Sequence, residues 1–339
     1  MGGVLQASST APADEASAIV ARGDRQARMI DRGLDVGIYL ALVALIVYFS
    51  IRSDVFLTKA NLLNIGSAIA INGILAAGMT IVLICGQLDL SVGAVQGFVA
   101  VILVVLVSNH GWSLPVAIVF AVGCGLVCGL LNGVLIVVFG INSIIATLAS
   151  ASVIRGFAYI ATSGTTIPYD SPWLLNLAND RPLGIPVPLV VMVVVYVVSY
   201  IFLNRLRVGA HVYAAGGNAS AASRAGIRVD RLYYLVFFIS AAFAAVAGLI
   251  TVGQTASASA SYGTGVELTV LTAVLLGGIG LSGGAGRIER TLVGVVIIGV
   301  LQNGLVLTNV QSYYQQVASG IVFLLAVVAE ATRRKRARR

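Results

Sequence analysis

The hydrophobic residues of this chain form long uninterrupted blocks. Stretches such as 186–203 (PVPLVVMVVVYVVSYIFL) and 233–252 (YYLVFFISAAFAAVAGLITV) run for 18 and 20 residues without a charged side chain. A helix needs about 20 such residues to cross the ~30 Å hydrocarbon core of a bilayer. The pattern does not show the short strands of alternating polarity that build outer-membrane barrels. The sequence therefore predicts an all-α polytopic membrane protein.

The same criterion, applied along the chain, predicts about ten transmembrane helices. They cover residues 36–52, 61–85, 91–108, 114–139, 141–162, 186–203, 233–253, 265–282, 290–308 and 311–330. Residues 1–33 are polar and lack the apolar core of a signal peptide, so we expect a largely disordered arm. The membrane domain covers 34–330 and contains one long connection at 204–232, and residues 331–339 form a basic tail.

The distribution of charge predicts the orientation. Only 10% of the residues are charged, whereas a soluble domain carries about 25%. Seventeen basic residues fall on the side that holds both termini, and three, Arg52, Lys59 and Arg181, fall on the other. Both termini are therefore expected in the cytoplasm. Anionic lipid headgroups account for the basic tail and the net charge of +8, without a nucleic acid partner.

A short internal similarity predicts two inverted repeats. GLLNGVLIVVFGINSI (129–144) resembles GVLQNGLVLTNVQSYY (299–314), with Asn132-Gly133 matching Asn303-Gly304. The ten-helix topology directs the two segments in opposite senses across the membrane. Inverted repeats of this kind are typical of transporters, in which two units move around a shared pathway.

Few ionisable residues lie near the predicted spans, and three of them are candidates for a role. Asp89 and Ser91 in GQLDLSVG stand where a side chain can cap the next helix, and Glu267 in GTGVELTV allows the same interpretation. A direct role in transport is the alternative for both acids. Arg155 is interpreted as a snorkelling residue, a ligand of carbonyls at a helix break, or part of a substrate path.

The glycines of LLGGIGLSGGAG (275–286) have the Gly-x-Gly-x-x-Gly spacing of a dinucleotide-binding turn. That turn needs a βαβ unit and an acidic residue about 20 positions later. Here the apolar VVIIGVLQNG of another span follows instead. We expect these glycines, Gly283 and Gly284 among them, to allow sharp turning and close packing at a cytoplasmic gate.

The residues do not indicate an enzyme, a metal or a cofactor on this chain. The phosphate-binding pattern G-x-x-x-x-G-K-[ST] is missing, and the two His residues form no cluster with the three Cys residues, which lie in apolar runs. If transport uses ATP, another chain has to bind it. In the 204–232 connection, a helix over Ala219–Ala225 ending at Gly226 is either part of a solvated basic loop or a docking helix for a cytoplasmic partner.

The docking interpretation is supported by a resemblance. GGNASAASRAGI is similar to the coupling loop of bacterial ATP-binding-cassette importer permeases, whose pattern is Glu-Ala-Ala-x-x-x-Gly. The positions that match this pattern are Ser220, Ala221, Ala222 and Gly226. Arg224 is one of the three variable residues between Ala222 and Gly226. Ser220 replaces the acid of the pattern, which removes a specific ion pair with the ATPase while leaving the docking surface.

More specifically, segments 86–95, 141–168 and 268–305 resemble sugar permeases of the ribose, xylose and galactose type. Gln87 departs from the Gly or Glu that this family has there. The resemblance implies a permease subunit of the bacterial inner membrane that pairs with a second copy or a paralogue. It also implies a cytoplasmic ATPase, which carries ATP and Mg, and an extracytoplasmic sugar-binding protein.

The pathway is then expected at the dimer interface. Its lining candidates are the amide side chains of Asn72, Asn132, Gln302 and Asn303, because amides can hydrogen-bond sugar hydroxyls. Interhelical hydrogen bonds are the alternative role for these residues. The scarcity of central ionisable residues weighs against an ion-coupled secondary carrier, the other function considered.

Overall fold

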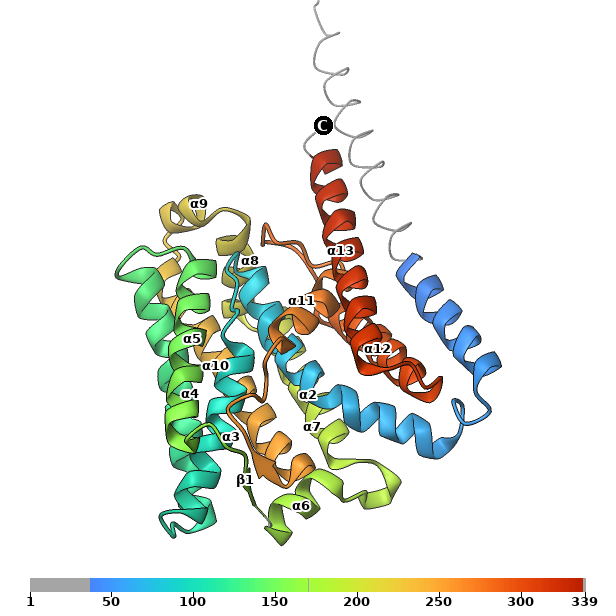
Figure 1. The fold of residues 1–339 in the computed structure, drawn as a ribbon. Helices are drawn as coiled ribbons and strands as arrows, with labels where there is room; N and C mark the ends of the chain where they lie inside the picture. Colours follow the sequence, from blue (N-terminus) through green and yellow to red (C-terminus); the bar gives the residue numbers. More distant parts are fainter. Residues whose placement is uncertain (1–36, 170, 338–339) are drawn as a thin grey trace, which may run out of the picture.

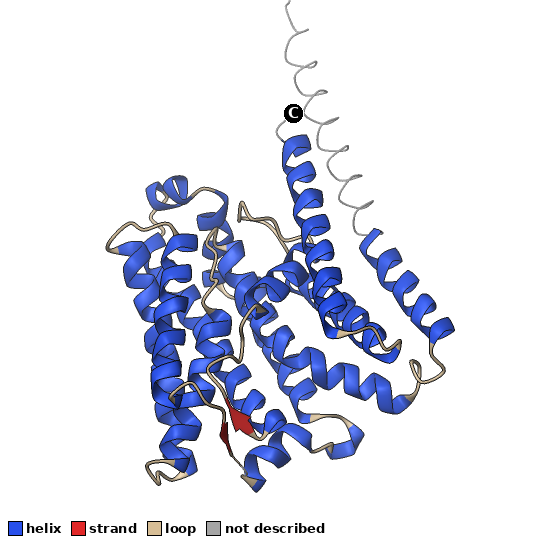
Figure 2. Ribbon diagram, in the orientation of Figure 1, coloured by secondary structure: helices blue, strands red, loops and turns tan. Residues whose placement is uncertain are grey.

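The computed structural model describes residues 37–169 and 171–337, and these residues form a helical bundle with one two-residue strand pair (Figures 1 and 2). The predicted arm, 1–33, and the last two residues of the tail lie outside the described residues. Within the described residues, seven helices are long and apolar enough to cross a membrane: α2 (Lys59–Ile84), α4 (Leu114–Val137), α5 (Ser143–Thr162), α7 (Val187–Arg205), α10 (Val229–Thr255), α12 (Ile288–Leu307) and α13 (Ser312–Ala337).

Three apolar helices are shorter: Gly37–Arg52, α3 (Val92–Ser108) and α11 (Val266–Leu276). The remaining elements are α6 (Pro172–Asn179), the 3-10 turn η1 (Pro182–Gly184), α8 (Arg207–Gly217), α9 (Ala219–Arg224), β1 (Ile167–Pro168) and β2 (Ser257–Ala258). The two strands pair antiparallel, with Ile167 opposite Ala258. A polytopic helical architecture is confirmed, and helices occur in all ten predicted segments.

The eighth predicted segment, 265–282, is helical only as far as Leu276. Eleven residues of helix span about 16 Å, half the hydrocarbon thickness. The chain leaves the helix at Gly277, and Gly278 has φ +78°, which a side chain with a Cβ rarely adopts. Hydropathy runs on through these glycines, so the sequence pattern overestimates the length of the helix.

The centre of the bundle is formed by α2 and α10. In their most apolar 18-residue stretches, 78% and 61% of the residues are buried, against 6% in α13. Small residues bring α4 against α10: a Cβ at Gly129 would lie 2.6 Å from the Ala241 Cβ and from the Phe237 carbonyl oxygen. Lipid offers no hydrophobic driving force between helices, so this close van der Waals contact holds the pair together.

Two parts of the chain share one order of elements. In each, a long central helix is followed by an extended break, a short helix and two further helices: α2 to α5, and α10 to α13 (Figure 1). Toward its end α4 meets the start of α10, at Gly133 and Tyr234, and shortly before α12 the turn at Gly284 meets the end of α8 at Gly217. Helix α4 therefore runs toward the end that carries α8 and α9, and α12 runs away from it. These are the opposite directions that the predicted inverted repeat requires.

We predict that Gly129→Leu destabilises the protein, because overpacking a well-packed contact costs about 1–3 kcal/mol. Gly123→Leu in the same helix is the control, since no atom lies within 4 Å of a Cβ at that position. The midpoint of thermal unfolding in detergent should fall for Gly129→Leu alone. Equal midpoints for the two variants would contradict the packing assignment.

Candidate functional site: broken helices and a polar cavity

The carboxyl group of Asp89 lies inside the bundle, in the break between α2 and α3. It is 2% exposed and accepts hydrogen bonds from the Ser91 backbone N–H (2.9 Å), the Ser91 Oγ (2.6 Å) and the Ser240 Oγ (2.7 Å). Ser240 lies eleven residues into the 27-residue α10. Asp89 is therefore near the mid-depth of the bundle, whereas its position in the sequence predicts the end of a span.

Ser91 occupies the N-cap position of α3, but its hydroxyl donates to Asp89 and makes no cap hydrogen bond. The Asn132 Nδ2 of α4 donates to the same Ser91 Oγ at 2.9 Å. Asn132 is fully buried. In this conformation it joins helices and does not face an open path, which matches the alternative role considered for it.

Two backbone N–H groups of this break donate hydrogen bonds to side chains of α5. The Leu88 N–H donates to the Ser143 Oγ at 3.2 Å, and the Leu90 N–H donates to the Thr147 Oγ1 at 3.1 Å. Non-helical backbone at membrane depth is tolerated only where protein or a water-filled cavity supplies its hydrogen bonds. The two hydroxyl groups meet that need.

Glu267 lies at the second break, in the first turn of α11. Its buried Oε2 has no hydrogen-bond partner among the described residues, and a Cβ at Gly93 would lie 2.8 Å from it. Gly93 belongs to the first turn of α3. The N-termini of the two short helices thus approach each other with a carboxyl group between them, where both helix dipoles favour negative charge.

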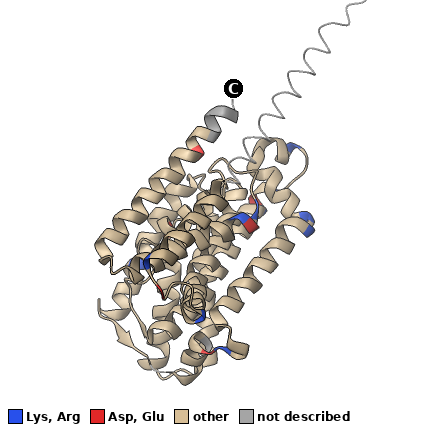
Figure 3. Ribbon diagram, turned by 90° about the vertical axis from the view of Figure 1, so that its right-hand side faces the viewer, with Lys and Arg blue, Asp and Glu red and all other residues tan. Residues whose placement is uncertain are grey.

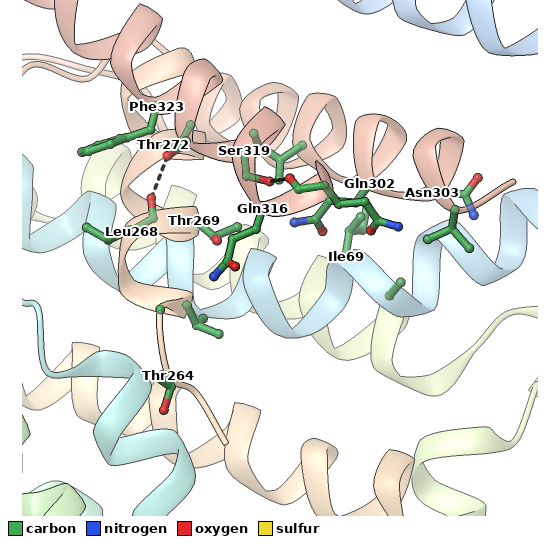
Figure 4. Close-up of a pocket in the computed structure, with 18 residues that line it drawn as sticks. Ile69, Thr264, Leu268, Thr269, Thr272, Gln302, Asn303, Gln316, Ser319 and Phe323 are labelled. Atoms are coloured by element: carbon green, nitrogen blue, oxygen red, sulfur yellow. Dashed lines mark hydrogen bonds between the residues drawn. The ribbon is translucent and has the colours of Figure 1, made fainter. Parts of the chain in front are cut away.

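A cavity of about 670 Å³ lies between α2, α11, α12 and α13 (Figure 4). Of the predicted pathway residues, Gln302 and Asn303 line it. Its other polar lining residues are Thr264, Thr269, Thr272, Gln315, Gln316 and Ser319. None of the described residues that line it is charged, in keeping with the few charged residues along the helices (Figure 3).

The four predicted pathway residues differ in their surroundings. Asn303 exchanges two hydrogen bonds of 3.0 Å with Asn61 of α2, so its side chain both lines the cavity and joins two helices. Asn72 is half-buried on α2 and is not among the described residues that line the cavity. The four amides therefore do not form one cluster.

The segment formed by α8 and α9 lies at the end of the molecule away from α6 and the strand pair (Figure 1). Asn218 caps α9 by accepting from the Ala221 N–H at 2.9 Å. Ala222 points inward and is 5% exposed, whereas Ser220, Ala221 and Arg224 are exposed. The predicted helix over Ala219–Ala225 is present one residue shorter, and Gly226 follows it with φ +87°.

The glycine-rich turn lies beside this segment. The residues that precede it, 268–275, are helical, so the βαβ unit of a dinucleotide site is not formed there. The Tyr213 hydroxyl of α8 donates to the Gly286 carbonyl oxygen at 2.9 Å. Burial, and to a lesser degree the charge of Glu289, raise the pKa of Tyr213, so the hydroxyl keeps its proton and remains a donor.

Broken helices with satisfied backbone, a neutral polar cavity and an exposed helical segment at one end define a polytopic membrane transport protein. The chain belongs to the family described as "Branched-chain amino acid transport system / permease component", whose model matches residues 61–327. As a permease component it is a transport subunit of the bacterial cytoplasmic membrane and not an enzyme, as the sequence predicts.

Characterised relatives are named for sugars. The chain is 36% identical to the ribose import permease protein RbsC of Escherichia coli K12, over 86% of this chain and 92% of the relative, and 38% identical to that of Bacillus subtilis, over 87% and 92%. It is 33% identical to the L-arabinose ABC transporter permease protein AraH of Azospirillum brasilense, over 100% and 99%. No solved structure matches the chain. The resemblance to sugar permeases is confirmed.

Sequence reasoning missed several residues of the site. Ser143, Thr147 and Ser240 support the first break, and Gln315, Gln316 and Ser319 line the cavity. The spacing of Gln315, Gln316 and Ser319 gives a polar face within the last predicted span, a signal that was available in the sequence. The partners of Asp89 carry no comparable signal, because isolated Ser and Thr residues occur throughout the spans.

We predict that Asp89→Ala strongly destabilises the protein. It leaves three buried donors without an acceptor, and each unsatisfied donor costs about 1–3 kcal/mol. The exposed Asp54 provides the control variant Asp54→Ala. Thermal unfolding in detergent should show a large loss for Asp89→Ala only, and a midpoint like that of the control would refute the role of the carboxyl group.

Proposed function

We propose that this chain is the membrane-spanning subunit of an ATP-driven importer for a sugar. The observation that carries the proposal is the neutral cavity between α2, α11, α12 and α13, whose amides and hydroxyls match the hydrogen-bonding groups of a sugar. The names of the ribose and arabinose permeases to which the chain is similar support the same class of solute.

The chemistry of the cavity favours a sugar over a branched-chain amino acid, the solute in the name of the family. An amino acid carries an ammonium and a carboxylate group, and burying either charge without a partner is costly. The described residues that line the cavity offer no charged partner. A sugar needs only neutral donors and acceptors, which Gln302, Gln316 and Thr269 provide.

The proposed topology has ten membrane crossings with both termini in the cytoplasm. The end of the molecule that carries α8 and α9 then faces the cytoplasm, in agreement with the five arginines of the 204–232 connection. The opposite end, with α6 and the β1–β2 pair, faces outward. There, 164–182 and 254–265 offer a docking surface for the sugar-binding protein.

The proposed cytoplasmic partner is an ATPase subunit that carries ATP and Mg. Its contact surface is the exposed part of α9, with Ser220, Ala221 and Arg224, together with Gly226. A groove of about 430 Å³ runs beside α9, and its lining includes Arg228, Asp230 and Arg231. Because Ser220 is neutral, it cannot form an ion pair with the ATPase. The docking surface is then defined by the shape of α9 and by this groove.

The functional unit is proposed to be a dimer with a second permease chain. Much of α13 is exposed in the single chain, including Gln316 on the cavity wall. A cavity with one open wall is completed when a second subunit covers it. Glu267 has a buried carboxyl oxygen without a partner among the described residues and lies between Val266 and Leu268 of the cavity lining, so we assign it to the water-filled path between the subunits. Arg155 lies on α5, which packs against α3 and α4, and is not assigned to this path.

Uptake in proteoliposomes tests the proposed function. The chain, reconstituted with its ATPase and binding protein, should accumulate a pentose or hexose when ATP is supplied inside. Uptake should survive an uncoupler. ATP-independent uptake that an uncoupler abolishes, or uptake of leucine but no sugar, would contradict the proposal.

The same assay tests the cavity. We expect the double variant Gln302→Ala, Gln316→Ala to reduce sugar uptake by about tenfold or more, since each lost hydrogen bond to a neutral group is worth about 0.5–1.5 kcal/mol. Gln311→Ala is the control, because Gln311 is exposed and lies outside the cavity lining. Equal losses in both variants would exclude this cavity from the path.

Docking of the ATPase on α9 is tested by a substitution at an exposed position of that helix. Ala221→Trp places a large ring on the outer face of α9 and should abolish co-purification of the ATPase while the permease stays folded. Asn176→Trp on α6, also exposed but at the opposite end, should leave the ATPase bound. An intact complex with Ala221→Trp would move the docking surface elsewhere.

A further inference from the structure

Three segments that are far apart in the sequence meet at one point beside the proposed docking segment. They are the end of α8 at Gly216, the end of α2 at Ile84 and Gly86, and the turn at Gly283 and Gly284. We call these five residues the glycine junction. The Gly284 N–H donates to the Ile84 carbonyl oxygen at 2.8 Å, which joins the turn to the end of α2.

The segments approach so closely that side chains are excluded. A Cβ at Gly216 would collide with the Ile84 carbonyl oxygen and lie 2.6 Å from the Gly284 backbone N. A Cβ at Gly283 would lie 2.8 Å from the Gly86 backbone N and 3.0 Å from the Gly216 carbonyl oxygen. The atoms nearest to a Cβ at Gly216 are thus all backbone atoms, which cannot rotate away as the end of a flexible side chain can.

The conformation of the turn adds to its stiffness. Gly283 and Gly284 have φ of +73° and +74°, a left-handed pair that only glycine adopts without strain. The turn is also attached to α8 by the hydrogen bond from Tyr213 to Gly286. Closely packed elements without voids transmit a displacement instead of absorbing it.

The junction lies between the docking segment and both helix breaks. On one side, α8 continues through Asn218 into α9. On the other side, Gly86 precedes Asp89 by three residues in the first break, and the glycine turn follows directly on α11, whose first turn holds Glu267. The junction therefore connects α8 to the chain segments that adjoin both short helices.

We propose that Gly216 is a positioning residue for transport: through it the docking segment pushes on the ends of α2 and α11 together, so that both breaks move with the ATPase. This inference rests on the proposed function, in which α8 and α9 receive the ATPase. It adds the place where the movement enters the membrane domain. Gly216 touches neither substrate nor nucleotide in this account.

Gly216→Ala tests the proposal, with Gly217→Ala as its matched control. A Cβ at Gly217 meets only the Gly284 Cα, at an unstrained 4.0 Å. The two variants are compared in proteoliposomes that contain the ATPase and the binding protein. The readout is the number of sugar molecules imported per ATP hydrolysed, together with co-purification of the ATPase.

The expected result is that Gly216→Ala still binds the ATPase and hydrolyses ATP but imports about 3- to 30-fold less sugar per ATP, the range for changes in coupling between distant sites. Gly217→Ala should match the wild type. A wild-type ratio in folded Gly216→Ala protein would overturn the proposal. Equal losses in Gly216→Ala and Gly217→Ala would also overturn it, since they would indicate general damage to α8.

If the Gly216→Ala protein does not fold, the same ratio of sugar to ATP is measured for the variant Tyr213→Phe. It removes the second attachment between α8 and the glycine turn without adding volume, and it should lower the ratio of sugar to ATP while the ATPase stays bound. An unchanged ratio would overturn the proposal. Failure of the proposed function is distinguishable, because the wild-type chain itself would then bind no ATPase or import no sugar.

Discussion

The structure depends on the hydrogen bonds that hold non-helical backbone inside the bundle. Between α2 and α3 the chain is not helical at mid-depth, and several of its amides have lost the partners that a continuous helix supplies. Hydroxyl groups of Ser143 and Thr147 take over two of them, and the Asp89 carboxyl group binds a third together with two hydroxyls. In lipid, each unsatisfied group costs several kcal/mol, so this set of contacts is a condition for the break to exist.

Broken helices give the bundle an interior surface that continuous helices cannot provide. The short helices α3 and α11 begin inside the protein, with their N-termini near each other and Glu267 between them. The polar cavity lies against α11, and the glycine junction attaches both breaks to the α8–α9 segment. The chain thus connects the proposed docking surface to the polar groups in its centre through a small number of contacts.

The sequence was sufficient for the helical class, for the positions of the ten apolar helices and for the family, because each of these helices is an apolar block and several motifs occur in the right order. It did not predict α6 or α8, which lack such a block. It was insufficient for the length of α11, since hydropathy does not register the left-handed backbone at Gly278. It also placed Asp89 near a span end, because its partner Ser240 lies 151 residues away in the sequence. Of the predicted amides, Gln302 and Asn303 line the cavity, while Asn132 is buried between helices and donates to Ser91. Whether a polar side chain faces the cavity or a neighbouring helix depends on how the helices pack, and the hydrophobic pattern does not contain that information.

In the proposed importer, fixed contacts hold the breaks while the cavity changes the side of the membrane to which it opens. A pair of cryo-electron microscopy structures of the complete transporter in lipid nanodiscs, one without nucleotide and one with a non-hydrolysable ATP analogue, tests this directly. We expect the hydrogen bonds of Leu88 and Leu90 to α5 to persist in both structures, while the cavity lined by Gln302 and Gln316 opens to opposite sides of the membrane. A break that refolds into continuous helix in either structure, or a cavity that opens to the same side in both, would contradict it.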